Sequence, residues 1–463
     1  MIEVFSYNLF SIRSLFGDFR LTEKEKISSI STTSTEVKKG TLFIPLRGNR
    51  DGHEFIPDAL SRGAIAFLCE KDHPILKELN FEEIQKAIIV DNTLYALGKI
   101  AAFHRNRFNP LVIGITGSSG KTTTKELMGL VALQIGKEQV VITEKNYNNE
   151  IGVPFTLFRI NEKTKIVVCE MGMNHSREIA RLTAIARPGI ALVTNVGPCH
   201  IENLGSLEGI AHAKAEIIEG MPERSILFIP ETVLHRKIFQ EKAKQQKVIL
   251  KNFSVKKSHD MKIEQVLPEG FELNLFGSKL NWNIPGEKIL ENLSGVISVA
   301  KELNFNPDEI RKGLSTYKAK DKRFVIEKKH YRLINDTYNA NPDSMESSLT
   351  SLRQVALANP YYAILGDMKE LGKFSKLYHL QLGLFCKDLG LSGLITFGKD
   401  AQWIAKEYYK NKKKEKILHF IDSNESIEAL IAYVKSEIPK GSFILVKGSR
   451  SMKMERIVEG LSF

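Results

Sequence analysis

The sequence predicts an α/β protein of three domains, and three observations support this fold class. Short apolar runs alternate with helical patterns along most of the chain, which is typical of parallel sheets covered on both faces. A Gly-Ser turn with Lys121 and Thr122 follows one of these runs and opens a helix. The length, 463 residues, suits about three domains of ordinary size. We expect domains at 1–108, 109–318 and 319–463.

The first unit is the smallest and has its own α/β pattern. A turn leads into a strand at 40–46, and a short helix at 59–62 precedes a strand at 64–69. Gly63 separates that helix from the strand. The Asn-Pro pair at 109–110 marks the boundary with the second unit.

The second and third units each contain a series of apolar strands. In the second unit they lie at 111–115, 166–169, 191–194 and 226–229. In the third they lie at 333–337, 362–365, 394–397, 418–421 and 443–446. We therefore expect a mostly parallel sheet in the central domain and another α/β domain after it. Alternating apolar and polar residues at 261–284 indicate an antiparallel hairpin attached to the central domain.

The turn after the strand at 111–115 predicts a P-loop nucleotide site. Small residues let backbone N–H groups face a phosphate, and the helix start adds positive partial charge. Lys121 would reach the β- and γ-phosphates, and Thr122 would offer its hydroxyl to Mg²⁺. Ile115 stands where the usual pattern has its first glycine, so a plain Gly-Ser turn is the alternative. The predicted nucleotide contacts are Thr116, Gly117, Ser118, Ser119, Gly120, Lys121, Thr122 and Thr123.

Two residues that follow strands are candidate metal ligands. Glu170 ends the run IVVCE, and a carboxylate there suits Mg²⁺, although a capping or surface glutamate is the alternative. His200 follows the strand at 191–194, and its imidazole is an available ligand or a solvated loop side chain. Lys214 lies in a helical stretch where His212 and Glu216 do not share its face, so the pattern favours an exposed lysine.

Two polar loops follow strands of the third unit. Asp336 begins DTYNANPD, where a carboxylate suits a ribose hydroxyl or a helix cap. Lys447 and Arg450 flank a Gly-Ser turn that suits a carboxylate or phosphate, or is simply solvated. Ligands bind at the carboxyl ends of strands in open α/β sheets, and these loops occupy such ends.

The net charge of +12 does not by itself indicate nucleic acid. Three short, widely separated stretches at 236–247, 318–329 and 410–416 account for the whole excess. The first and third resemble solvated faces, and no aromatic residues accompany the charges as in nucleic-acid binding. An anionic small substrate suits a basic protein equally well.

The four cysteines lie far apart and form no CxxC pair, which argues against a disulfide framework or zinc site and fits a reducing cytoplasm. No apolar run approaches the roughly 18 residues of a membrane span, and the N-terminus shows no cleavage-site pattern. We expect neither a membrane span nor a nucleic-acid partner.

Together these motifs resemble the Mur ligase family, the ATP-dependent amide ligases of peptidoglycan precursor synthesis. The resemblance covers nearly the whole chain in order, through TLFIPLRGNRDGHEFIPDAL, TGSSGKTTTKE, NYNNEIGVP, EMGMNH, TNVGPCHIENLGSLEGIAHAKAEI, DTYNANPDSM, LGDMKELG and VKGSRSMKME. Three of these, NNEIGVP, DTYNANPDSM and LGDMKELG, are typical of the branch that adds D-alanyl-D-alanine to UDP-N-acetylmuramoyl-tripeptide.

The resemblance implies a UDP-sugar-binding N-terminal domain, a central P-loop ATPase and a C-terminal Rossmann-like ligase domain. It implies ATP and Mg²⁺ as cofactors, with metal contacts from Thr122, Glu170, His200 and Lys214, the last as a CO₂-derived carbamate. Asn292 would lie near the adenine, Asp336 at the ribose, and Arg323 at the γ-phosphate. The implied catalytic residues are Lys121, Glu170, His200, Lys214 and Arg323, and the implied substrate contacts are Asn148, Asn149, Tyr338, Asn339, Asn341, Lys447 and Arg450.

The reaction implied by the resemblance passes through an acyl phosphate, which the amine of D-alanyl-D-alanine then attacks in the cytoplasm. The enzyme is expected to be a monomer. One alternative is a sister ligase, such as the diaminopimelate-adding enzyme or a folylpolyglutamate synthetase, which the three branch motifs disfavour. The other is a P-loop ATPase that drives a partner or binds nucleic acid.

Overall fold

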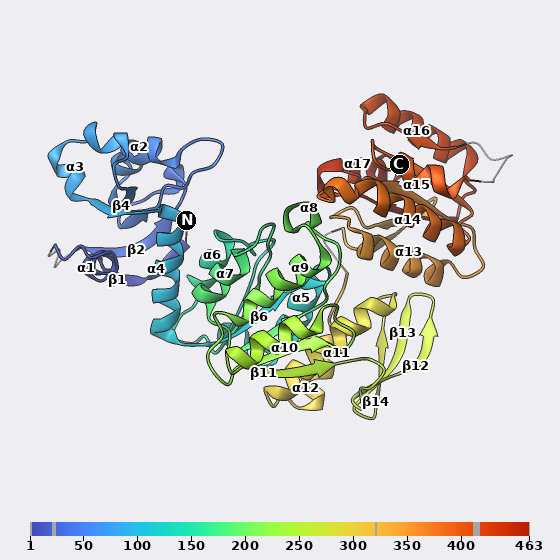
Figure 1. Ribbon diagram of the computed structural model, residues 1–463, viewed down its shortest axis with the longest axis horizontal. Helices are drawn as coiled ribbons and strands as arrows, with labels where there is room; N and C mark the ends of the chain where they lie inside the picture. The colour runs from blue at the N-terminus through green and yellow to red at the C-terminus, as the bar shows by residue number, and fades with distance from the viewer. Residues whose placement is uncertain (1, 21–24, 320–321, 411–416, 463) are drawn as a thin grey trace.

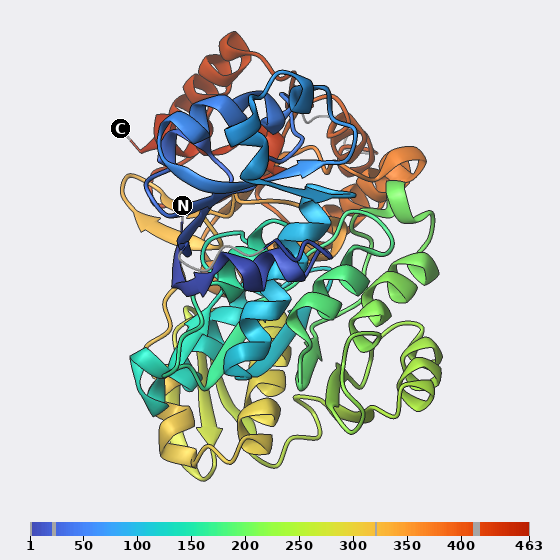
Figure 2. The same ribbon diagram turned by 90° about the vertical axis from the view of Figure 1, so that its left-hand side faces the viewer.

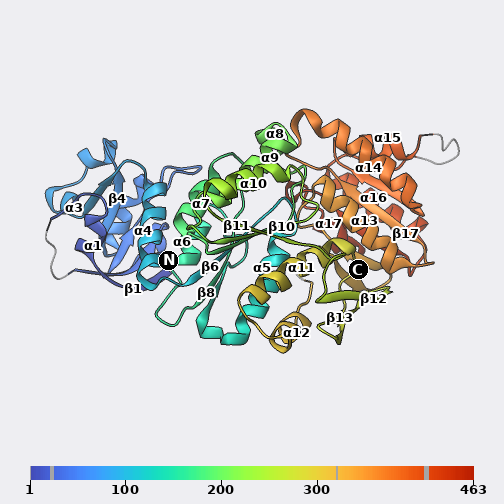
Figure 3. The same ribbon diagram turned by 60° about the horizontal axis from the view of Figure 1, so that its bottom comes forward.

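The computed structural model describes residues 2–20, 25–319, 322–410 and 417–462, which form three α/β domains in a row (Figure 1). Figure 3 shows the same order with the central sheet between the two outer domains. In Figure 2 the N-terminal domain faces the viewer, in front of part of the C-terminal domain.

The N-terminal domain has a sheet in the order β1-β2-β3-β4-β5, in which β1 and β2 are antiparallel and the other pairs are parallel. Its elements are β1 (Ile2–Asn8), α1 (Leu9–Ser14), β2 (Lys26–Ser31), β3 (Thr41–Phe43), α2 (Ile56–Ser61), β4 (Ala64–Glu70), α3 (Phe81–Gln85), β5 (Ala87–Val90) and α4 (Thr93–Phe108). The strands predicted at 40–46 and 64–69 are confirmed as β3 and β4. The predicted helix begins earlier, at Ile56, because Pro57 suits the first turn of a helix.

The central domain has a parallel sheet in the order β11-β10-β9-β6-β8-β7. Its sheet and covering helices are β6 (Leu111–Thr116), α5 (Lys121–Ala132), β7 (Val140–Ile142), α6 (Gly152–Leu157), β8 (Ile166–Glu170), α7 (Glu178–Ala186), β9 (Ile190–Val193), α8 (Ile201–Leu204), α9 (Leu207–Ala215), β10 (Ile226–Pro230), α10 (Arg236–Gln245), β11 (Ile249–Phe253), α11 (Glu287–Glu302) and α12 (Pro307–Ser315). The four predicted strands are confirmed. The sequence prediction missed the edge strands β7, which is very short, and β11, which contains Lys251 and Asn252.

The segment at 261–284 is a three-stranded antiparallel sheet of β12 (Met261–Leu267), β13 (Gly270–Leu275) and β14 (Ser278–Trp282). The prediction of a hairpin was therefore wrong by one strand. Alternate residues of the middle strand, Phe271, Leu273 and Leu275, are buried against the central domain's core.

The C-terminal domain has a sheet in the order β15-β16-β20-β17-β18-β19, in which β15 is antiparallel to its neighbour. Its elements are β15 (Val325–Lys328), β16 (Arg332–Asn335), α13 (Pro342–Ala356), β17 (Tyr361–Gly366), α14 (Ser375–Leu389), β18 (Gly393–Phe397), α15 (Gln402–Tyr408), β19 (His419–Phe420), α16 (Asn424–Glu437), β20 (Phe443–Lys447) and α17 (Glu455–Leu461). The five predicted strands are confirmed. The edge strand β15 was missed because its short, partly charged sequence has little apolar pattern.

The basic stretch at 236–247 lies largely on α10 and exposes most of its lysines, as expected. The stretches at 318–329 and 410–416 fall partly outside the described residues. Within the described ranges, no helix has the length and apolar character needed to cross a membrane.

Candidate active site

A cavity of about 520 Å³ lies between the central and C-terminal domains. Strands β6 and β8 of the central sheet and β16 and β20 of the C-terminal sheet end at it, so loops far apart in sequence meet there. The predicted site residues that line it are Ser118, Ser119, Gly120, Lys121, Thr122, Thr123, Asn148, Glu170, His200, Asn292, Arg323, Asp336, Tyr338, Asn339, Asn341 and Lys447. Thr116, Gly117, Asn149, Lys214 and Arg450 lie outside this lining.

The two glycines of the phosphate loop, Gly117 and Gly120, stand where no other residue fits. Gly117 has φ +150°, and a Cβ there would lie 1.8 Å from Oγ1 of Thr194. Gly120 has φ +77°, and a Cβ there would lie 2.6 Å from Nδ2 of Asn292. The shifted glycine spacing in the sequence therefore follows from close packing of the loop. Lys121, the first residue of α5, donates from Nζ to the carbonyl of Gly117 at 2.7 Å.

Glu170 has the geometry of a hard-cation ligand. It is 1% exposed, and its Oε1 accepts hydrogen bonds from Thr122 Oγ1 at 3.2 Å and Asn148 Nδ2 at 2.8 Å. Its Oε2 is buried and has no hydrogen-bond partner among the described residues. A buried carboxylate oxygen without a partner is costly unless a cation binds it. Asn149, by contrast, accepts the N–H groups of Ile151 and of Gly152, the first residue of α6.

His200 contacts a carboxylate of the C-terminal domain. Its Nδ1 lies 2.6 Å from Oε2 of Glu370, which follows β17. This contact lowers the pKa of the Glu370 carboxyl. The sequence reasoning assigned no role to Glu370, although it stands within the motif LGDMKELG and could have been found there.

Lys214 corrects the expectation of an exposed lysine. Its side chain is fully buried, and Nζ has no hydrogen-bond partner in the described part of the chain. Burial lowers the pKa of the amine from 10.5 to about 7. Spacing along α9 predicted exposure, but packing places this face of the helix inside the protein. A substantial fraction of the amine is therefore neutral near pH 7, the state that is nucleophilic.

Asp336 and Lys447 form a buried ion pair, with Oδ2 and Nζ 2.7 Å apart. Asp336 also accepts the backbone N–H of Phe324 at 3.1 Å and the hydroxyl of Ser348 at 2.5 Å. Asp336 thus anchors the residue that follows Arg323. Arg450 instead pairs with Glu455 at 3.0 Å on the surface.

Arg323 connects the two domains. Its Nη2 donates to Thr122 Oγ1 at 3.3 Å, and its guanidinium lies 3.7 Å from the ring centroid of Tyr338. An arginine held over an aromatic ring is well placed for a phosphoryl group in the loop below it.

The cavity has an apolar side that the sequence reasoning missed. Tyr317 lines it and stacks on Trp282, with ring centroids 5.7 Å apart and planes 5° apart. Ile284 and Ile289 line the same cavity. Nothing in the local sequence around Tyr317 marks it as a site residue.

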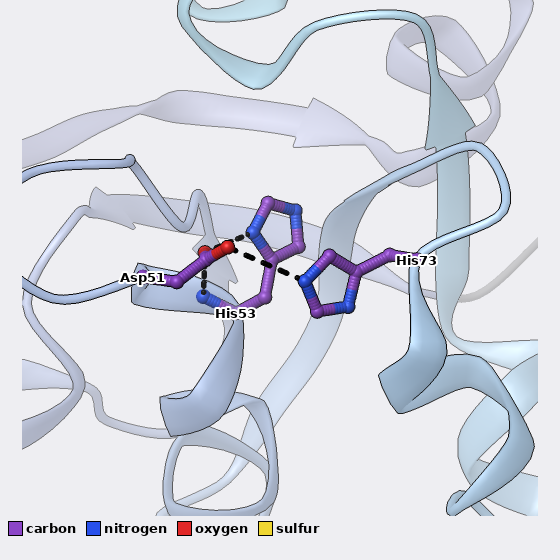
Figure 4. Close-up of side chains that lie close together, drawn as sticks. All are labelled: Asp51, His53 and His73. Atoms are coloured by element: carbon purple, nitrogen blue, oxygen red, sulfur yellow. Dashed lines mark hydrogen bonds and ion pairs between the residues drawn. The ribbon is translucent and has the colours of Figure 1, made fainter.

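The N-terminal domain contains a group of metal-ligand type, Asp51, His53 and His73 (Figure 4). His53 Nε2 accepts the N–H of Glu70, and His73 Nδ1 accepts the N–H of Ile75, both at 3.2 Å. Because the other nitrogen of each ring accepts a backbone N–H, a ring proton can sit only on the nitrogen that faces Asp51, at 2.6 Å for His53 and 3.4 Å for His73. A bound metal would need lone pairs on those same nitrogens. We therefore interpret the group as two histidines that hold Asp51 by hydrogen bonds and not as a metal site.

A P-loop at the carboxyl edge of a parallel sheet, reached by an arginine of a second α/β domain, defines a nucleotide-dependent enzyme with an interdomain active site. The chain belongs to the Mur ligase family. Family models match as the Mur ligase family catalytic domain at 26–105, the Mur ligase middle domain at 115–300, and the Mur ligase glutamate ligase domain at 322–450. The resemblance inferred from the motifs is thus confirmed.

Relatives and solved structures match nearly the whole chain. The UDP-N-acetylmuramoyl-tripeptide--D-alanyl-D-alanine ligase of Bacillus subtilis is 33% identical, covering 95% of this chain and 94% of its own. The ligase of the same name from Escherichia coli is 33% identical, covering 94% of each chain. The structure of MurF from Acinetobacter baumannii superposes with a TM-score of 0.86 at 26% identity, covering 100% of both chains. MurF ligase from Thermotoga maritima in complex with ADP gives 0.79 at 29% identity, covering 94% of this chain and 97% of that one.

Proposed function

We propose that the protein uses ATP to join D-alanyl-D-alanine to UDP-N-acetylmuramoyl-tripeptide in peptidoglycan synthesis. Ligases of that name are 30% to 34% identical to this chain over at least 92% of its length. The ADP complex of the Thermotoga maritima relative supports ATP as the nucleotide.

The contact between Arg323 and Thr122 is the observation that carries the mechanism. It joins a C-terminal side chain to the phosphate loop, so the phosphoryl donor and its acceptor are expected to meet between the two domains. A carboxylate oxygen of the tripeptide attacks the γ-phosphorus, and the bond from that phosphorus to ADP breaks. Lys121 and Arg323 offset the negative charge on the transferring group.

The second step forms the amide. The amine of D-alanyl-D-alanine attacks the acyl carbon, the bond from that carbon to the phosphate oxygen breaks, and the amine loses a proton. Asn148, Tyr338, Asn339 and Asn341 line the cavity and are assigned to substrate. Asn149, Lys447 and Arg450 are also assigned to substrate. Asn149 and Arg450 lie outside the cavity lining and Lys447 is paired with Asp336, so we expect them to act by shaping the loops.

The residues present fit Mg²⁺. The unpartnered Oε2 of Glu170 and the hydroxyl of Thr122 are hard oxygen ligands, and His200 is the third assigned ligand. Bound there, Mg²⁺ would neutralise phosphate charge. Asn292 and Asp336 are assigned to the adenine and ribose of ATP, as the family resemblance implies. Both line the cavity, and Asn292 lies beside Gly120 of the phosphate loop.

Lys214 is assigned as a carbamate-forming lysine. Its neutral, buried amine would attack CO₂, forming an N–C bond and releasing a proton, which converts the amine into an anionic oxygen ligand. The buried Nζ has no hydrogen-bond partner among the described residues, which is costly, and a carbamate would remove this cost. The absence of a partner therefore supports the assignment.

Three further expectations belong to this proposal. The domain limits stand at 108/109 and 318/319, the first directly after α4. The enzyme acts as a monomer, and it acts in the cytoplasm.

The test is release of phosphate from ATP in the presence of both substrates and with each one omitted. Rapid release should require both UDP-N-acetylmuramoyl-tripeptide and D-alanyl-D-alanine, and the amide product should form in equal amount. Release that ignores the dipeptide would overturn the ligase in favour of a partner-driven ATPase. Turnover with diaminopimelate or glutamate in place of the dipeptide would indicate a sister ligase.

A further inference from the structure

The phosphate loop is held by the side chain of Asn195, which is not among the site residues assigned above. Asn195 follows β9, the neighbour of β6 in the central sheet. Its Oδ1 accepts the backbone N–H of Ser118 at 3.0 Å and of Ser119 at 2.9 Å. Its Nδ2 donates to the hydroxyl of Ser119 at 2.6 Å.

The residues beside Asn195 reinforce this grip. Thr194 donates from Oγ1 to the carbonyl of Ser119 at 2.6 Å, in the space that the missing Cβ of Gly117 leaves open. Ser118 exchanges two hydrogen bonds with the backbone of Gly197, each at 2.9 Å. The loop is thus bound to the segment after β9 along its first half.

These bonds divide the N–H groups of the loop into two sets. Those of Ser118 and Ser119 donate to the neutral side-chain oxygen of Asn195, and that of Ser118 also reaches the backbone carbonyl of Asn195 at 3.2 Å. Those of Lys121, Thr122 and Thr123, in the first turn of α5, have no acceptor within the helix, and all three residues line the cavity. A phosphate is therefore offered the second set and not the first.

We propose that Asn195 is a positioning residue that shapes the phosphate loop for the β-phosphate of the nucleotide. Its single amide oxygen accepts two N–H groups without carrying a charge, so it holds the loop and does not repel the phosphate. A carboxylate would accept the same two N–H groups, and the hydroxyl of Ser119 could turn to donate to it. Asn195→Asp would therefore differ from the wild type mainly in the negative charge that it places beside the phosphate. This inference rests on the proposed use of ATP.

The experiment compares inhibition constants of ADP and AMP against ATP in the wild type, Asn195→Ala and Asn195→Asp. The ratio of the inhibition constant of AMP to that of ADP measures how much the β-phosphate contributes to binding. We expect Asn195→Ala to lower this ratio about tenfold, because hydrogen bonds that hold the loop are lost. Asn195→Asp should lower it at least as much while its unfolding midpoint stays near that of the wild type. The KM for D-alanyl-D-alanine should not change.

Asn161→Ala is the matched control, because Asn161 also accepts a backbone N–H in the central domain but in a surface turn. It should leave the ratio unchanged. An unchanged ratio in Asn195→Ala, with a lower unfolding midpoint, would mean that Asn195 only stabilises the domain. Wild-type binding in Asn195→Asp would mean that its oxygen lies away from the phosphate. Failure of the wild type to bind ADP would instead overturn the proposed function.

Discussion

Nη2 of Arg323 lies 3.3 Å from Oγ1 of Thr122, although the two residues belong to different domains. Arg323 is held from two sides, by the Tyr338 ring beneath its guanidinium and by Asp336, which accepts the N–H of the next residue. Closure of the two domains around a nucleotide would thus act through this side chain.

Arg323→Ala should lower kcat on the order of 10³-fold, because the transferring phosphoryl group loses a cation that acts mainly in the transition state. Arg323→Lys should recover little of it, since an ammonium cannot reproduce the planar fork over Tyr338. Steady-state phosphate release measures both. Arg332→Ala is a matched control, as Arg332 also stacks on an aromatic ring, that of Phe443. A kcat equal to that of the control would remove Arg323 from the mechanism.

Asp336→Asn should destabilise the protein by about 3 kcal/mol, because it leaves the buried Lys447 ammonium without its counter-charge. The double variant Asp336→Asn/Lys447→Met should regain part of this loss. Urea unfolding gives the free energies. The exposed pair Lys247–Glu223, at 2.8 Å, is the control, and its removal should cost less than about 1 kcal/mol. Additive effects of the two buried substitutions would contradict a coupled pair.

Glu170→Gln should raise the Mg²⁺ concentration for half-maximal activity about tenfold or more. The amide keeps an acceptor for Thr122 and Asn148 but removes the charge on the buried, unpartnered oxygen. Activity titrations with MgCl₂ measure the shift. An unchanged Mg²⁺ requirement would place the metal elsewhere.

Lys214→Met should abolish activity without lowering stability. In the uncarbamylated protein the unfolded chain binds a proton at Lys214 between about pH 7 and 10.5 and the folded protein does not. Wild-type stability should therefore rise by about 2 kcal/mol relative to Lys214→Met from pH 7 to 9 in bicarbonate-free buffer. Urea unfolding at both pH values checks the slope. The carbamate is tested with Lys214→Ala. A short carboxylic acid should partly restore the activity of this variant, and a lack of restoration would contradict the carbamate.

Asp51→Asn should cost about 2 kcal/mol at neutral pH, and this cost should disappear as the pH falls from about 4 to 2. Burial alone would raise the pKa of Asp51, but the backbone and ring N–H groups of His53 outweigh it and lower it from 3.8 to about 2. The folded carboxylate therefore stabilises the protein above its unfolded pKa and loses this effect in acid. Thermal unfolding across this pH range provides the comparison. Zn²⁺ should not raise the unfolding midpoint of the wild type. If Zn²⁺ raised the midpoint of the wild type but not that of Asp51→Asn, these residues would be a metal site.

Much of the fold could be predicted because local sequence pattern controls local structure. The run before Thr116 and the glycines at 117 and 120 belong to one continuous segment, so strand, turn and helix could be inferred together. Edge strands such as β15 were missed because they are short and half-exposed, and they carry no continuous apolar run. Glu370 stood in a quoted motif, but nothing local indicated its contact with His200.

The sequence by itself determined the class of fold, the phosphate loop and the membership of a family of ATP-dependent ligases, since each depends on order and spacing along the chain. Only the tertiary structure decided that Lys214 is buried, that Arg323 reaches Thr122, and that Asn195 holds Ser118 and Ser119. Burial and contact depend on how distant segments pack against one another. A helix position that looks exposed from spacing alone becomes interior once a second layer covers it.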